Sequence, residues 1–215
     1  MQSIIYYLLN KIFMNEVEEE ILKYSSKGDK IVFDIGCFRG GFTKNFIKNE
    51  KKLGMESTFF LFDPNPITKD YLKSILQNEK IKYFNLALDN SNSQKKFYLN
   101  NFFEPSGSSL NTTFRDDKKW KNTRKIFMQI LQPFKKIEDF SEINVQTQTL
   151  DNFCLEEKIN NIDVLKIDTE GNELNVLKGA KKLLEQNKIN IIYTEISETK
   201  KRFLEKEKSI IDFLN

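Results

Sequence analysis

The sequence predicts an α/β domain built on a mostly parallel β-sheet with helices on both faces. Apolar segments of strand length alternate with segments of helical periodicity, and 215 residues are enough to bury one substantial core. Strands that are apolar along their whole length and alternate with helices form parallel βαβ units, buried on both faces. We expect this domain over residues 29–215, preceded by a helical segment over residues 1–28.

The elements follow one another in a regular order. The first strand ends within the stretch VFDIGCFRGGFT, and Pro66 suits the first turn of a later helix, where its missing N–H costs little. We predict strands over Lys30–Ile35, Thr58–Asp63, Lys80–Leu88, Lys95–Leu99, Ile162–Asp168 and Ile189–Ile196, and helices over Phe42–Lys52, Pro66–Gln77, Asn172–Gln186 and Glu198–Leu214.

Two segments depart from this alternation. Residues 100–144 are polar and weakly periodic, with a predicted helix over Lys118–Leu131, so they form either a lid or substrate loop or a disordered surface excursion. Near the N-terminus, Ile5, Leu8 and Ile12 recur at helical spacing, which predicts an amphipathic helix that covers the sheet. This apolar stretch is too short for a membrane span, so we expect no integral membrane segment.

The composition excludes several classes of function. A formal charge of +3 from 34 basic and 31 acidic residues does not predict nucleic-acid binding, which usually needs a concentrated basic face. Two distant cysteines offer neither a disulfide framework nor zinc spacing, which favours a reducing, cytoplasmic location. The chain has no histidine, so proton transfer must fall to a carboxylate, Lys, Tyr, Cys or water.

Carboxylates follow the predicted strands, at the sheet edge where open parallel sheets bind ligands. An acidic rim there favours a cationic or hydroxyl-rich ligand. The acids concerned are Asp34, Asp63, Asp89, Asp168, Glu170 and Glu195.

The glycines after the first strand narrow the choice of ligand. Their spacing, Gly36-x-x-x-Gly40-Gly41, fits neither the dinucleotide fingerprint nor the phosphate-binding P-loop, which disfavours an NAD-dependent reductase. We expect Asp34 to face a cationic group and Asp63 to accept from ribose hydroxyls, which together indicate S-adenosylmethionine. The alternative is that Asp34 caps the next turn and Asp63 merely precedes a proline turn.

Several motifs together resemble a known family. FDIGCFRGGFT, FDPNP, NLALDN, SGSSL, TLDNF and above all KIDTEGNELNVLKGA resemble the FkbM-type methyltransferases. The resemblance implies a Rossmann-like class I methyltransferase fold, S-adenosylmethionine as cofactor, and O-methylation of a hydroxyl on a sugar, glycan or small natural product. By position it implies cofactor contacts from Asp34, Gly36, Gly40, Asp63, Ala87 and Leu88.

Two departures from the family pattern matter. Phe38 stands where the family usually has Asn. The chain also ends at SIIDFLN, without the last two C-terminal strands that the fold usually has. We therefore expect the outer edge of the fifth strand to be covered by the N-terminal helix or by a second copy in a homodimer. A non-catalytic domain that binds cofactor or a partner is the alternative function.

The chemistry of methyl transfer requires a base for the acceptor hydroxyl. Asp168 is the first candidate, Glu195 the second, and Glu170 is expected to orient the substrate. We expect Lys166 to pair with a neighbouring acid. A Mg²⁺ site made by Asp168, Glu170 and Glu195 is a less favoured alternative, so no metal is predicted. In the insert, Ser108, Ser109 and Asn111 either contact the substrate or form only a turn.

Overall fold

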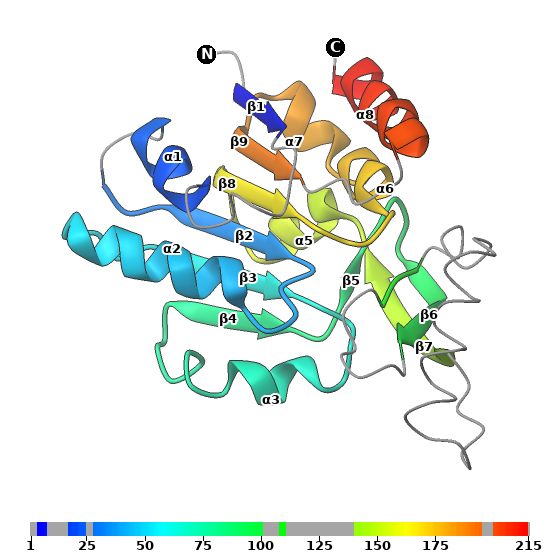
Figure 1. The fold of residues 1–215 in the computed structure, drawn as a ribbon, viewed down its shortest axis with the longest axis horizontal. Coiled ribbons are helices and arrows are strands. Elements are labelled where there is room, and N and C mark those ends of the chain that lie inside the picture. The colour runs from blue at the N-terminus through cyan, green and yellow to red at the C-terminus, as the bar shows by residue number, and fades with distance from the viewer. Residues whose placement is uncertain are drawn as a thin grey trace.

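In the described residues the main sheet contains six strands, all parallel, in the order β1-β9-β8-β2-β3-β4 (Figure 1). The computed structural model describes residues 4–7, 17–24, 28–100, 108–110, 140–194 and 200–214. The predicted parallel α/β fold is confirmed. The six strands are β1 (Ile4–Tyr7), β2 (Ile31–Ile35), β3 (Thr58–Phe62), β4 (Ile81–Phe84), β8 (Ile162–Ile167) and β9 (Ile189–Thr194).

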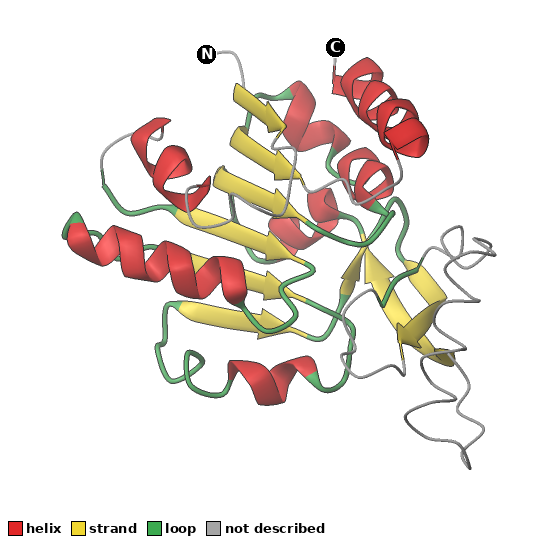
Figure 2. Cartoon of the chain, in the orientation of Figure 1, coloured by secondary structure: helices red, strands yellow, loops and turns green. Residues whose placement is uncertain are grey.

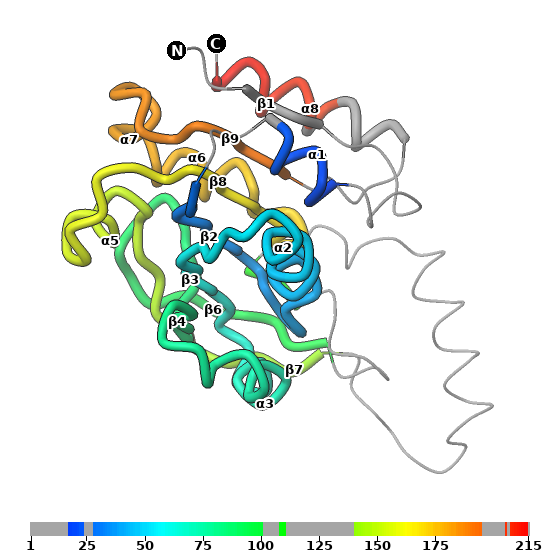
Figure 3. Tube along the Cα trace, turned by 90° about the vertical axis from the view of Figure 1, so that its left-hand side faces the viewer, coloured from blue at the N-terminus to red at the C-terminus, as the bar shows by residue number. Residues whose placement is uncertain are grey.

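Helices cover both faces of this sheet, as Figures 2 and 3 show from two sides. Successive strand residues point to opposite faces, so Val32 and Phe33 belong to different buried clusters. The Val32 face packs against α1 (Val17–Tyr24), α2 (Gly41–Lys52) and α3 (Thr68–Leu72). The Phe33 face packs against α5 (Leu150–Glu156), α6 (Glu173–Lys178), α7 (Lys181–Glu185) and α8 (Lys200–Leu214).

A second, smaller sheet lies beyond the carboxyl ends of the main strands, where the arrows point in Figure 1. Its order is β5-β7-β6, with β6 and β7 antiparallel. It consists of β5 (Ala87–Leu88), β6 (Ser93–Asn100) and β7 (Phe140–Gln148).

The strand predicted over Lys80–Leu88 is wrong as one element. Its first half is β4 of the main sheet, and its second half is β5 of the small sheet. Between the two halves, the Asn85 amide donates to the Asp63 carbonyl (3.1 Å) and helps to turn the chain. Strand β7 was not predicted, because its first residues fall within the polar insert.

The N-terminal helix was also misplaced. The described part of residues 1–28 contains β1 as well as α1, and β1 pairs in parallel with β9 from Ile4–Ile191 to Tyr7–Thr194. The run IIYY consists of residues with high strand propensity, and pairing with β9 outweighs the helical spacing. β1 therefore lies on the outer side of β9, where we expected a helix or a second copy.

The helix predicted over Asn172–Gln186 is two helices, α6 and α7. They meet at Gly179, where a Cβ would lie 2.2 Å from the Asp89 carbonyl oxygen, so only glycine permits this close approach. The Asp151 carboxylate then accepts the backbone N–H groups of Lys182 and Leu183 (2.9 and 3.0 Å) at the start of α7. The helix predicted over Lys118–Leu131 lies outside the described residues. No helix in the described ranges is long and apolar enough to cross a membrane.

Candidate active site at the carboxyl edge of the main sheet

The turn after β2 is tightly packed against the end of β8. Gly36 has φ +74°, and a Cβ there would lie 1.8 Å from the carbonyl oxygen of Asp168. The Gly36 N–H donates to the Phe62 carbonyl (2.8 Å), and the Asp168 N–H donates to the Ile35 carbonyl (2.9 Å). These contacts bring the ends of β2, β3 and β8 together. The predicted glycine loop thus lies directly beside the first candidate base.

Phe38 is the unusual residue of this turn. Its φ of +41° is left-handed, a region that bulky residues rarely adopt and Asn tolerates better. Its ring makes an edge contact with Tyr71 on α3 (centroids 5.5 Å apart), and the Arg39 guanidinium lies over both rings (5.3 and 4.8 Å). Gly40, also left-handed, ends the turn at the start of α2.

Asp63, after β3, holds two segments of backbone. One carboxylate oxygen accepts from the Phe38 N–H (2.9 Å), and the other accepts from the Asn65 N–H (2.8 Å). Burial raises the pKa of Asp63 to about 6, although these N–H groups favour the charged form. Each oxygen keeps a second lone pair. The predicted contact with ribose hydroxyls is compatible with this arrangement and stays a prediction.

Asp34 lies inside the protein, with no exposed surface. One carboxylate oxygen accepts from the Thr43 hydroxyl (2.7 Å). The other forms an ion pair with Lys166 Nζ at 3.0 Å, although the angles are not those of a hydrogen bond. The expectation that Lys166 pairs with an acid is confirmed. The cation that faces Asp34 here is Lys166, and a direct contact between Asp34 and cofactor stays a prediction.

Lys166 also connects Asp34 to the end of β8. Its ammonium lies 3.5 Å from Asp168 Oδ2 and donates to the Gly36 carbonyl (2.9 Å). Burial alone would lower the pKa of Lys166, but the charges of Asp34 and Asp168 raise it above its ordinary value. The predicted acidic rim is therefore partly neutralised, because Lys95 likewise pairs with the buried Asp89.

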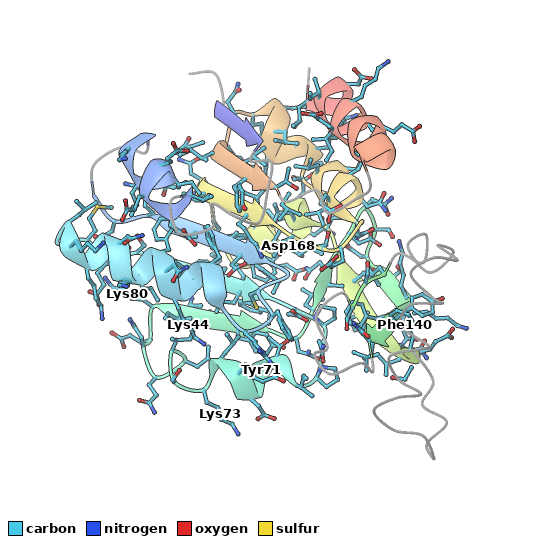
Figure 4. The ribbon with its side chains drawn as sticks, viewed as in Figure 1. Lys44, Tyr71, Lys73, Lys80, Phe140 and Asp168 are labelled. Atoms are coloured by element: carbon cyan, nitrogen blue, oxygen red, sulfur yellow. The ribbon has the colours of Figure 1, made fainter. Side chains whose placement is uncertain are left out.

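Asp168 differs from Asp34, Asp63 and Asp89, which are buried, because 30% of its side chain is exposed. Figure 4 places it at the carboxyl end of β8, with Tyr71 of α3 and Phe140 of the small sheet both below it in this view. The chain then turns through Glu170 and Gly171, which both have left-handed backbones (φ +53° and +105°). Of the candidates for proton transfer, Asp168 and Glu170 are therefore neighbours on one loop.

The remaining predicted site residues are either buried in apolar clusters or lie outside the described residues. Ala87 and Leu88 form β5, and their side chains are buried in apolar clusters, so their role beside adenine stays a prediction. Glu195 and Asn111 lie outside the described residues. In the described ranges, no three acidic, cysteine or histidine side chains converge as metal ligands. Because Glu195 is not included, the Mg²⁺ alternative stays untested.

Comparison with known proteins identifies the family. The family model described as the Methyltransferase FkbM domain matches residues 34–215. The chain belongs to the FkbM methyltransferase family. It is 26% identical over 190 residues to a curated relative, 2-O-methyltransferase NoeI of Sinorhizobium fredii (strain NBRC 101917 / NGR234), and the match covers 85% of this chain and 70% of NoeI.

A solved structure is also similar. The crystal structure of Methyltransferase FkbM from Methylobacillus flagellatus KT matches with 14% identity and a TM-score of 0.46. The match covers 79% of this chain and 34% of the solved chain, so this FkbM family member spans about a third of that protein's length.

The site residues of this FkbM domain fit a cofactor that carries a positive charge and ribose hydroxyls. Each Asp63 oxygen at the end of β3 accepts one backbone N–H and has a second lone pair, and the Asp168 side chain is 30% exposed, whereas Asp34 Oδ1 is already paired with Lys166 at 3.0 Å. The turn from Gly36 to Gly40 brings backbone close to the sheet edge without a Cβ at either glycine. Such an edge suits S-adenosylmethionine better than a phosphate-rich cofactor.

One residue that shapes this FkbM site is not among the predicted site residues. Glu173 is buried, and its Oε1 accepts from the Thr169 N–H (3.1 Å), the Thr169 hydroxyl (3.1 Å) and the Gly171 N–H (2.9 Å). It thereby holds the loop that follows Asp168. The available signal was an acid in the first turn of a predicted helix, a position where carboxylates bind free N–H groups.

Proposed function

We propose that this chain is an S-adenosylmethionine-dependent O-methyltransferase that acts on a hydroxyl of a sugar, glycan or small natural product. Family membership and the relative named as a 2-O-methyltransferase support this proposal. The observation that carries it is the partly exposed carboxylate of Asp168 beside the glycine turn. A cytoplasmic location and a homodimer stay predictions; two free, buried cysteines are compatible with the former.

The residues divide into a binding group and a reacting group. Gly36, Gly40 and Asp63 would hold the cofactor, with Asp34 behind them. When bound, S-adenosylmethionine supplies a methyl group activated by the adjoining sulfonium. The chain must then position the acceptor hydroxyl and remove its proton, and such positioning accounts for much of the rate in transfer reactions of this kind.

Asp168 is the best-placed base among the described residues. Its carboxylate is partly exposed, whereas those of Asp34, Asp63 and Asp89 are buried and bound to other groups of the protein. It would accept the hydroxyl proton as the acceptor oxygen is methylated. Lys166 Nζ lies 3.5 Å from Asp168 Oδ2 and would help to fix the direction of this carboxylate. Glu170, on the same loop, would orient the acceptor, and Glu195 is the second candidate for the base.

The Asp168→Asn variant tests this assignment. We expect turnover to fall by about 10²–10⁴-fold, the usual contribution of a general base, while cofactor affinity stays close to wild type. The assay is mass-spectrometric detection of a methyl group added to members of a panel of glycans and lipid-linked glycans. Glu170→Gln on the same loop is the matched control, with a smaller expected loss.

Two outcomes would overturn different parts of the proposal. Full turnover by Asp168→Asn on an identified acceptor would overturn the base assignment, because another group would then take the proton. If the wild-type chain binds the cofactor but methylates no acceptor in the panel, the result favours the alternative of a non-catalytic binding domain.

A further inference from the structure

The loop Thr169–Gly171, which follows Asp168, is held from two sides by residues of different segments. On one side, Glu173 of α6 accepts the two backbone N–H groups and the Thr169 hydroxyl at 2.9–3.1 Å. On the other side, the Ser109 hydroxyl lies 3.0 Å from the carbonyl oxygens of both Thr169 and Glu170. The loop's N–H and C=O groups therefore have separate anchors.

Ser109 is itself fixed to the small sheet. Its backbone forms an antiparallel bridge with Tyr98 of β6, with hydrogen bonds of 3.0 and 3.1 Å in the two directions. Ser109 is only 1% exposed, so its hydroxyl is shielded from water. A movement of β6 relative to the main sheet would therefore be transmitted to the carbonyl groups next to Asp168.

This contact gives one serine of the SGSSL motif a partner within the protein. Ser109 binds a loop 60 residues further along the chain. The expectation that the motif contacts the substrate or forms only a turn stays a prediction. Because the two carbonyls share one hydroxyl proton, the hydrogen bond is three-centred, and it favours the backbone orientation in which both oxygens point to Ser109.

We propose that Ser109 is a positioning residue for methyl transfer, which couples the small sheet to the loop beside Asp168. The proposal rests on the proposed function, in which Asp168 takes the proton. The left-handed backbone of Glu170 is a conformation that needs support from its surroundings, because its residue carries a Cβ. Ser109 and Glu173 provide it from opposite sides. Removal of the hydroxyl would leave two carbonyl groups without this donor and loosen the loop.

The test compares Ser109→Ala with Ser108→Ala. The Ser108 hydroxyl makes a contact of the same length, accepting the Asn100 N–H at 3.0 Å, but this contact lies within the small sheet. Both variants delete one hydroxyl from adjacent positions. Hydrogen exchange at the Thr169 and Gly171 amides reports on the loop without any acceptor, and steady-state kinetics report on catalysis.

We expect Ser109→Ala to exchange these two amides about tenfold faster than wild type and to lower kcat about tenfold, with KM for S-adenosylmethionine unchanged. Ser108→Ala should leave exchange at both amides unchanged. Wild-type exchange in Ser109→Ala, or equal acceleration in both variants, would overturn the proposal. Failure of the proposed function would appear separately, as absence of wild-type turnover with the exchange difference still present.

Discussion

The turn after β3 and the loop after β8 both carry an aspartate at the carboxyl edge of one sheet, but they use it differently. Asp63 is 7% exposed and binds backbone N–H groups of the protein with both oxygens. The Asp168 side chain is 30% exposed, and its loop is held by Glu173 and Ser109. In the first turn the acid supports the backbone, whereas in the second other residues support the backbone.

This difference suits Asp63 to cofactor binding and Asp168 to proton transfer. A carboxylate committed to N–H groups is fixed in place, which suits a contact with hydroxyl groups that do not react. A carboxylate with exposed surface, on a loop anchored by other residues, can approach an acceptor and take a proton. Asp34 is used in a third way. It is buried, and its charge is neutralised by Lys166, which also lies near Asp168.

The largest expected effect comes from pushing the two turns apart. Gly36→Ala would place a Cβ 1.8 Å from the Asp168 carbonyl oxygen on a residue with φ +74°. We expect a loss of unfolding free energy on the order of 4 kcal/mol or more, measured by urea denaturation. Gly41→Ala is the control, because a Cβ there meets nothing within 4 Å. Since Ala has a higher helix propensity than Gly, this variant should gain up to about 1 kcal/mol in unfolding free energy. Equal stability of the two variants would contradict the close contact of the turns.

The next effect comes from removing the shared cation. Lys166→Met would leave Asp34 buried without its partner, and we expect a loss of about 3–5 kcal/mol in unfolding free energy. Adding Asp34→Asn should recover part of that loss in a double-mutant cycle. Lys73→Met removes an exposed partner of Asp70 and should leave stability unchanged. A Lys166→Met protein as stable as wild type would show that the buried pair is not needed.

The smallest effect is a pH dependence of cofactor binding. Because burial raises the pKa of Asp63 to about 6, the carboxylate that we propose as the acceptor for ribose hydroxyls is lost as the pH falls through that value. We expect affinity for S-adenosylmethionine to fall about tenfold from pH 7 to pH 5. Asp63→Asn should bind more weakly and without this pH dependence. A wild-type affinity that is constant over the range would separate Asp63 from ribose recognition.

The same carboxyl has an opposite effect on folding. Its pKa in the folded chain lies above the ordinary value of 3.8, so the folded state binds the proton more tightly than the unfolded state. This group therefore favours folding increasingly as the pH falls from about 6 towards 4. Loss of affinity in that range would thus reflect the titration of Asp63 at the site rather than unfolding caused by it.

Much of the main sheet could be predicted because its strands are continuous apolar runs that end in acids or glycines. The strand ends at Asp34, Asp63 and Asp168 were found in this way. Strand β1 was missed because a short apolar run fits a helix or a strand equally well until its neighbour is known. The break after β4 depends on Asn85 reaching back to Asp63, a contact that local sequence does not reveal.

The partners of the acids could be predicted only in part. Lys166 was expected to pair with an acid because a charged residue within an apolar strand must be compensated. The commitment of Asp63 to the Phe38 N–H depends on how two turns meet, and the bond from Ser109 to the Glu170 carbonyl joins segments 61 residues apart. Neither contact follows from sequence spacing, because each joins segments that only the folded sheet brings together.

Isothermal titration with S-adenosylmethionine tests the central claim most directly. We expect the wild-type chain and Asp168→Asn to bind with similar affinity, and Asp63→Ala to bind much more weakly, because Asp63 belongs to the binding group and Asp168 does not. A wild-type chain that does not bind at millimolar ligand would contradict the account. So would equal loss of binding in Asp168→Asn and Asp63→Ala, since the two acids would then share one role.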